Sequence, residues 1–195
     1  MKGFKLNSGS HAKIQRPSIL RRFFSLIVMV VVVLGCAFLL RNYVCEPFEV
    51  PSASMEDTIM TGDYIFAEKV SYHFDDPQQG DIAVFADPQI PSRTLVKRVI
   101  ATEGQTVNLI DGQVYVDGVP LDEPYTNGLP SYPLSSAGSV SISYPYTVPE
   151  GCVWMMGDNR TNSLDSRYFG PIDVDTVYGK AILVYWPLNQ IGLLQ

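Results

Sequence analysis

The chain has 195 residues, of which 46% are hydrophobic, and a formal net charge of −6. This length fits one domain with an appendage, and the apolar content suffices for a packed core. Three cysteines in such a chain exclude a disulfide framework as the basis of the fold. The charge is uneven, because residues 1–22 carry six Lys and Arg and no acid, which leaves −12 on the remainder.

An uncharged apolar segment follows this basic tail and runs from Phe23 to Leu40. About 18 such residues reach the lower limit for crossing a bilayer. The alternatives are a buried core helix, a cleaved secretory signal and a lipoprotein box at Cys36. They are weaker, because the segment is apolar all round, lacks a small-residue exit and continues past Cys36.

The positive-inside rule orients this segment. We predict a single-pass protein of the cell membrane, with a cytoplasmic basic tail over 1–22 and a transmembrane signal anchor over 23–41. Residues 42–195 then form an extracytoplasmic domain, and the lipid bilayer is a partner.

The external domain is predicted to be mainly β, an antiparallel barrel or coiled sheet. Residues 43–50 should be extended, with an exposed strand edge near Val50. Residues 122–147, rich in Pro, Ser, Gly and Tyr, should form a loop-rich excursion, and no amphipathic helix is apparent. Asp111-Gly112 predicts a tight hairpin. The strand-like runs are 63–72, 81–85, 94–100, 106–110, 113–116, 151–156 and 177–186, with an apolar tail over 191–194.

Few side chains outside the anchor can support catalysis. His73 is the only histidine after the basic tail, which disfavours a Ser-His-Asp triad. Too few His and Cys remain for zinc, and Asp158 and Asp165 lack the spacing of a calcium loop, so we expect no metal and no cofactor. A Cys45–Cys152 bridge is compatible with an oxidising compartment, but we expect no essential disulfide.

A serine can instead be activated by a neutral lysine. Ser52 and Ser54 follow a proline just beyond the anchor, although a serine-rich turn is the alternative for this stretch. Lys97 lies in an apolar strand, where burial would lower its pKa from about 10.4 towards 7–8 and allow it to accept a proton. A solvated Lys97–Arg98 pair is the other interpretation, but neighbours in a strand point to opposite faces, so one of them can be buried.

Four motifs in order behind the anchor resemble the type I signal peptidases, which are membrane-anchored Ser/Lys proteases. They are Pro51-Ser52-Ala53-Ser54-Met55, Gly62-Asp63, Lys97-Arg98-Val99-Ile100 and the run from Gly157 to Arg167, GDNRTNSLDSR. The resemblance covers nearly all of residues 20–186, and the small size and single anchor look like the compact bacterial members.

The resemblance implies a role for each matching residue. Ser54 would be the nucleophile and Lys97 the general base. Ser52 would supply a side-chain donor to the oxyanion hole, together with the Ser54 backbone N–H. The supporting residues would be Ser163, which orients Lys97, and the Asp165–Arg167 ion pair. Within the same motif, we interpret Asp158 and Arg160 as parts of a charged loop closed by ion pairs.

Two departures from the family pattern stand out. Asp57 replaces the usual proline three residues after the nucleophile, and Glu103-Gly104-Gln105 replaces a Pro-Gly-Asp turn. The Asp57 carboxylate either approaches Lys97, which would raise the pKa of that lysine, or points to solvent or to a nearby backbone N–H.

The resemblance implies cleavage of secretory preproteins after a small-x-small motif as they emerge at the outer face of the membrane. An extended substrate would pair with the strand edge near Val50, and no nucleic acid is involved. The rivals are a self-cleaving repressor-type protease and a non-catalytic anchored β-domain that binds exported chains. Candidate walls of the substrate pocket are Val50, Met55, Ile59, Leu95 and Val96.

Overall fold

A computed structural model describes residues 19–136 and 140–194. The chain divides after Leu39 into two units, which are described separately. Helix α1, Ile19–Tyr43, occupies the described part of the first unit and extends into the second. None of its residues is buried, and by length and composition it can cross a membrane. The helix begins four residues before the predicted anchor and ends two after it, so residues 42 and 43 are helical and not extended.

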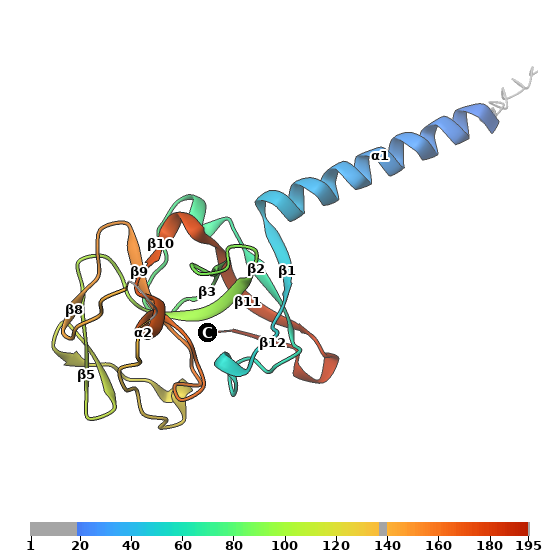
Figure 1. Cartoon of the computed structure of the whole chain (residues 1–195). Coiled ribbons are helices and arrows are strands. Elements are labelled where there is room, and N and C mark those ends of the chain that lie inside the picture. Colours follow the sequence, from blue (N-terminus) through green and yellow to red (C-terminus); the bar gives the residue numbers. More distant parts are fainter. Residues whose placement is uncertain (1–18, 137–139, 195) are drawn as a thin grey trace, which may run out of the picture. The chain divides into compact units, whose positions relative to one another are not determined.

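The second unit is built on a curled antiparallel sheet in the order β1-β2-β11-β3-β4-β9-β10, with β12 paired to β11 (Figure 1). Strands β1 and β10 are the two ends of this order, so the sheet is open. The mainly β prediction is confirmed, in its coiled-sheet form. The strands are β1 Cys45–Glu49, β2 Tyr64–Glu68, β3 Ile82–Ala86, β4 Thr94–Ala101, β9 Cys152–Met156, β10 Ile172–Asp173, β11 Val177–Trp186 and β12 Gly192–Leu193.

A smaller sheet has the order β7-β6-β5-β8. Its strands are β5 Thr106–Ile110, β6 Gln113–Val116, β7 Val119–Pro120 and β8 Tyr146–Thr147. Asp111 (φ 50°) and Gly112 (φ 82°) form the predicted hairpin between β5 and β6, since both adopt the positive φ that this turn requires. Ile100, Trp154 and Met156 of the large sheet pack into the core of the small one.

Strand β4 is the structural centre of the domain. It pairs with β3 along residues 94–98 and with β9 along residues 98–101. From Val96 to Ala101 every residue is buried, because both faces of this part of the strand are covered. Residues there must therefore be apolar or have polar partners, and all of them are apolar except Lys97 and Arg98.

The short helices were not predicted. Residues 53–55 form a 3-10 turn, η1, and Ser166–Phe169 form a single α-helical turn, α2. The Asp165 side chain caps α2 by accepting a hydrogen bond from the Arg167 backbone N–H. Such turns are too short to show helical periodicity. The predicted strand over 63–72 ends at Glu68, and the 3-10 turn η2, Ser71–His73, follows it. The remaining 3-10 turns are η3 Pro124–Thr126, η4 Val174–Thr176 and η5 Leu188–Gln190.

The structure also describes the cysteines and the predicted excursion. Cys45 and Cys152 are both free thiols, so they are not bridged. The predicted excursion over 122–147 contains η3 and β8 and otherwise lacks regular structure where it is described, and residues 137–139 lie outside the described residues.

Candidate active site

Ser54 lies in the 3-10 turn η1, which is held from two sides. Asn159, in the loop after β9, donates two hydrogen bonds to the turn. Its backbone N–H donates to the Ser54 carbonyl at 3.1 Å, and its Nδ2 donates to the Ala53 carbonyl at 3.0 Å. Met55 and Ile59 are fully buried in the core beneath. The Ser54 side chain is therefore presented on a backbone that is fixed by hydrogen bonds and by packing.

Lys97 meets Ser54 directly. Its Nζ lies 2.5 Å from Ser54 Oγ and donates to the Val96 carbonyl at 2.9 Å. Burial leaves Lys97 only 2% exposed and lowers its pKa to about 8, against the opposing pull of the Asp165 carboxylate. The Arg93 guanidinium lowers it further. A lysine in this state can be neutral near physiological pH and can accept the proton of the hydroxyl it touches.

Ser52 is the residue before the η1 turn, with extended φ and ψ of −137° and 156°. Its Oγ lies 3.3 Å from Ser54 Oγ, and its side chain lines the same groove. The Ser52 hydroxyl therefore lies beside the Ser54 hydroxyl, where it can turn towards an oxygen atom bound at Ser54.

Ser163 is brought to the site, but the expected hydrogen bond to Lys97 is absent. Within the described part of the chain the buried Ser163 Oγ has no hydrogen-bond partner, while Lys97 Nζ contacts Ser54 and Val96 instead. The Ser163 hydroxyl packs against Gly157. A Cβ at position 157 would overlap both Ser163 Oγ and the Ser54 carbonyl, so only glycine permits this close approach.

Asp165 and Arg167 form a buried ion pair below the site. Arg167 Nη2 and Nε donate to the two Asp165 carboxylate oxygens at 2.8 and 2.9 Å, and both side chains are at most 1% exposed. Asp165 also accepts from the Gly157 N–H at 3.0 Å, and Arg167 Nη2 donates to the Arg160 carbonyl at 2.8 Å. The pair thus fixes both ends of the loop between β9 and α2.

The rest of this loop is closed by two further ion pairs, as interpreted from the sequence. Arg98 binds Asp158 through Nε and Nη2 at 3.0 and 2.8 Å. Arg160 binds Glu123 of the excursion, with Nη2–Oε1 at 2.5 Å. Asp158 also accepts from Thr58 Oγ1 at 2.6 Å, which links the loop to the segment after Ser54.

The residues around Ser54 line a groove of about 530 Å³. Of the five predicted wall residues, only Leu95 lines it. Val50, Met55, Ile59 and Val96 belong to the core instead, and Val96 differs from Leu95 because adjacent strand residues face opposite sides of the sheet. Sequence reasoning missed most of the lining, which is Pro51, Ala53, Gln89, Arg93, Leu134, Thr161, Asn162, Leu164 and Phe169 beside Ser52, Ser54, Leu95, Lys97 and Ser163.

An open strand edge is present on β4, while β1, which ends at Glu49 beside Val50, is itself an end strand of the large sheet, so the expected edge near Val50 stays a prediction. The Val50 N–H donates to Asp63 at 2.9 Å and its carbonyl accepts from Gly62 at 2.8 Å, so its backbone is already used. In β4, the backbone N–H and C=O groups of Val99 form hydrogen bonds on the side of β3. Because these groups alternate in direction along a strand, those of Thr94 and Val96 point away from β3. On that side β9 pairs only from Arg98 onwards, which leaves residues 94–96 without a strand neighbour among the described residues.

Asp57 is bound away from Ser54 and Lys97. Its Oδ2 accepts a hydrogen bond from Asn127 Nδ2 at 2.8 Å, so its partner is a side chain of the excursion and neither Lys97 nor a nearby backbone N–H. Its φ is +76°, whereas proline is restricted to about −65°. The backbone found here therefore excludes the proline that the family pattern has at this position.

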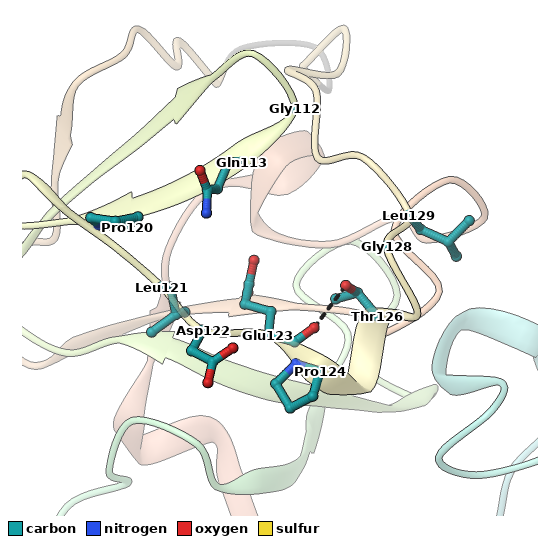
Figure 2. A pocket seen from close by; sticks show the side chains of 10 residues that line it. All are labelled: Gly112, Gln113, Pro120, Leu121, Asp122, Glu123, Pro124, Thr126, Gly128 and Leu129. Carbon is teal, nitrogen blue, oxygen red and sulfur yellow. Dashed lines mark hydrogen bonds between the residues drawn. The ribbon is translucent and has the colours of Figure 1, made fainter.

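A second hollow of about 470 Å³ lies beside β6, β7 and η3 (Figure 2). It contains the carboxylates of Asp122 and Glu123, of which Glu123 is bound to Arg160. None of the groove residues around Ser54 lines it. His73 is exposed in η2 and does not line the groove around Ser54. No cluster of His, Cys, Asp and Glu suited to a metal occurs among residues 19–136 and 140–194.

A hydroxyl touching a buried lysine, with a second hydroxyl beside it, is the arrangement of a serine hydrolase with a lysine base. Comparison with known proteins agrees. Residues 21–186 match the family described as signal peptidase, peptidase S26. The chain belongs to this family and is a serine peptidase of the signal peptidase I type, a family whose role is to cleave signal peptides. The resemblance predicted from the motifs is thereby confirmed.

Individual relatives show the same relationship. The chain is 41% identical over 175 residues to a probable signal peptidase I-1 of Synechocystis, covering 86% of this chain and 85% of that one. A signal peptidase I of Leptolyngbya laminosa is 37% identical over 162 residues, with 80% and 75% covered. A crystal structure of a signal peptidase I from Enterococcus faecalis V583 aligns at 32% identity with a TM-score of 0.45, covering 54% of this chain and 97% of that one. The apolar helix, the family match and the relatives from Synechocystis and Leptolyngbya laminosa indicate a membrane-anchored protein.

Proposed function

We propose that the chain removes signal peptides from secretory preproteins with Ser54 as nucleophile and Lys97 as general base. The observation that carries the proposal is the 2.5 Å contact between Lys97 Nζ and Ser54 Oγ, made by a lysine that is 2% exposed. Burial supplies the neutral amine, and the contact supplies the path for the proton.

In the first half of the reaction, neutral Lys97 takes the proton of Ser54 Oγ while the oxygen attacks the scissile carbonyl. The oxyanion that forms is stabilised by the Ser54 backbone N–H and by the Ser52 hydroxyl, each worth roughly 3 kcal/mol in a dry site. The lysine then gives its proton to the leaving amine. In the second half, Lys97 takes a proton from a water molecule whose oxygen attacks the acyl carbonyl, the bond to Ser54 Oγ breaks, and Lys97 returns the proton to Ser54 Oγ.

The supporting residues act on geometry. Asp165 and Arg167 hold the loop that carries Gly157 and Asn159. Gly157 packs against the Ser54 turn, and Asn159 donates hydrogen bonds to it. Ser163 lines the groove, and because its hydroxyl has no hydrogen-bond partner within the described ranges, it is available to the reacting groups when a substrate is bound.

The substrate is proposed to pair with the open edge of β4 at Thr94 and Val96 by strand addition. Its side chains then alternate, so that the residues at −1 and −3 before the scissile bond face the site together. A groove flanked by Leu95 and the short Ser52-Ala53-Ser54 segment leaves room for small side chains, which gives the small-x-small preference.

Substitution of the substrate tests this arrangement. Replacing alanine at −1 or −3 of a model preprotein by phenylalanine should lower kcat/KM by about 100-fold or more, because a bulky side chain cannot enter without moving the Ser54 turn. The same replacement at −2, which faces away, should change it by less than about 5-fold. Equal losses at all three positions would contradict the pairing.

We further propose that residues 1–22 lie in the cytoplasm and residues 42–195 outside, because the basic tail precedes the apolar helix. Protease added to spheroplasts should digest the domain after Arg41 and leave an epitope fused to the N-terminus intact. A protected C-terminal domain would reverse this topology.

A further inference from the structure

Three side chains follow one another along one face of β4 and its N-terminal extension. Lys97 and Leu95 lie two residues apart in the strand, and Arg93 continues the same alternation, since its carbonyl still accepts from Asp87 N–H at 2.9 Å across the hairpin. All three line the groove that holds Ser54. Arg93 therefore lies in the groove about four residues from the catalytic lysine.

Arg93 is anchored by a carboxylate that is hidden from the groove. Asp87 is 1% exposed and accepts hydrogen bonds from the Gln89 and Ile90 N–H groups at 2.8 and 3.2 Å. It also binds Arg93 through Nε at 2.6 Å and through Nη2. The Arg93 side chain is nevertheless 50% exposed. The Asp87 carboxylate is therefore buried, while the Arg93 guanidinium is exposed in a fixed orientation. Its Nη1 has no hydrogen-bond partner among the described residues.

Arg93 is also the principal charge that this groove offers. Among the described residues that line it, only Arg93 and Lys97 are ionisable, and Lys97 is buried and serves as a neutral base in the proposed reaction. Apart from the buried partner Asp87, no carboxylate of the described residues lies at the groove beside the guanidinium. A bound peptide with an acidic side chain near Arg93 would therefore meet the Nη1 side of a guanidinium whose charge is partly compensated by the buried Asp87.

Strand alternation gives the position of that side chain. When a peptide pairs with the open edge of β4, the side chains that share one face are two residues apart, as they are on β4 itself. With the −1 residue beside Ser54 and Lys97, the residue at −3 lies beside Leu95 and the one at −5 beside Arg93. We propose that Arg93 is a specificity-determining residue that recognises a carboxylate side chain at position −5 of the preprotein, an inference that rests on the proposed function.

The test compares three versions of one model preprotein, with Asp, Asn or Lys at −5, cleaved by the full-length chain in neutral-lipid vesicles. The wild type should prefer Asp to Asn by about two- to five-fold in kcat/KM, the scale of a partly exposed ion pair, and should disfavour Lys. Arg93→Gln should abolish the preference, and Arg93→Lys should retain part of it. Because each ratio is measured with one enzyme at one pH, any change in the pKa of Lys97 cancels.

Two control variants separate an effect of Arg93 from a general effect of charge or of misfolding. Lys180→Gln removes a cation of similar exposure, paired with Asp81 at 2.6 Å outside the groove, and should leave the preference unchanged. Arg93→Gln alone leaves the Asp87 carboxylate buried without its cation, which could prevent folding. A double variant, Asp87→Asn with Arg93→Gln, removes both charges and avoids this problem. It should show the same loss of preference.

An undiminished Asp/Asn ratio in the folded Arg93 variants would overturn the proposal, as would a charge effect at +5 and not at −5. An Arg93→Gln defect that appears only in anionic vesicles and ignores the −5 residue would assign the guanidinium to lipid headgroups instead. Absence of cleavage of every preprotein by the wild type would refute the proposed function itself, which is a different outcome from cleavage without a −5 preference.

Discussion

Lys97→Arg is expected to lower kcat/KM for preprotein cleavage by about 10³-fold or more. An arginine keeps the positive charge and much of the length of the side chain, but a guanidinium stays protonated and cannot take the Ser54 proton. General-base catalysis contributes about 10²- to 10⁴-fold. Lys180→Arg, which alters a lysine outside the groove, should cleave at the wild-type rate. An active Lys97→Arg enzyme would rule out the lysine base.

The wild-type pH profile provides the companion measurement. Burial lowers the pKa of Lys97 to about 8. Since the reactive form is the neutral amine, kcat/KM should fall as the pH drops through about 8 and should level off above it. A profile that is flat between pH 6 and 9 would contradict this assignment.

Asp165→Ala should be the most destabilising single change in the site, costing about 3–5 kcal/mol in the free energy of unfolding. The substitution leaves the Arg167 guanidinium buried without its counter-ion and removes the acceptor of the Gly157 N–H. Because Gly157 packs against Ser54, activity should be lost together with stability.

Chemical denaturation of the full-length protein in detergent measures the effect. Lys180→Ala, which removes the cation of the partly exposed pair with Asp81, should cost less than about 1 kcal/mol. If Asp165→Ala unfolded at the wild-type denaturant concentration, the buried pair would not be holding the loop.

The central strand could be predicted from sequence because its signals are local. Val96, Val99 and Ile100 are apolar and β-branched, which favours a strand. They flank Lys97 in the sequence, so the lowered pKa of this lysine follows from the same residues. The hairpin at Asp111-Gly112 was predictable for the same reason, since the turn residues themselves specify the positive φ.

The groove walls could not be predicted in the same way. Val50, Met55 and Ile59 are apolar residues near Ser54 in the sequence, and apolarity alone does not distinguish a pocket wall from the core they belong to. Val96 could have been excluded, since strand alternation places it on the face opposite Lys97. Leu134 of the excursion lines the groove, and the excursion has no periodic pattern from which the direction of this side chain could be predicted.

Side-chain partners over long sequence separations were also beyond local reasoning. Asp57 binds Asn127 across 70 positions, and Arg160 binds Glu123 from another segment. Residue type indicated that charges in the loop would pair, but the choice of partner depends on the tertiary fold. The orientation of the Ser163 hydroxyl, which was expected at Lys97, depends on packing against Gly157 in the same way.

Cleavage of a model preprotein by Ser54→Ala most directly tests the claim that Ser54 is the nucleophile. The purified full-length variant should fold and insert like the wild type, because the substitution removes one hydroxyl from a turn held by backbone contacts. Its cleavage should fall to background, whereas Ser71→Ala, at an exposed serine outside the groove, should cleave normally. Substantial turnover by folded Ser54→Ala would contradict the Ser54–Lys97 mechanism.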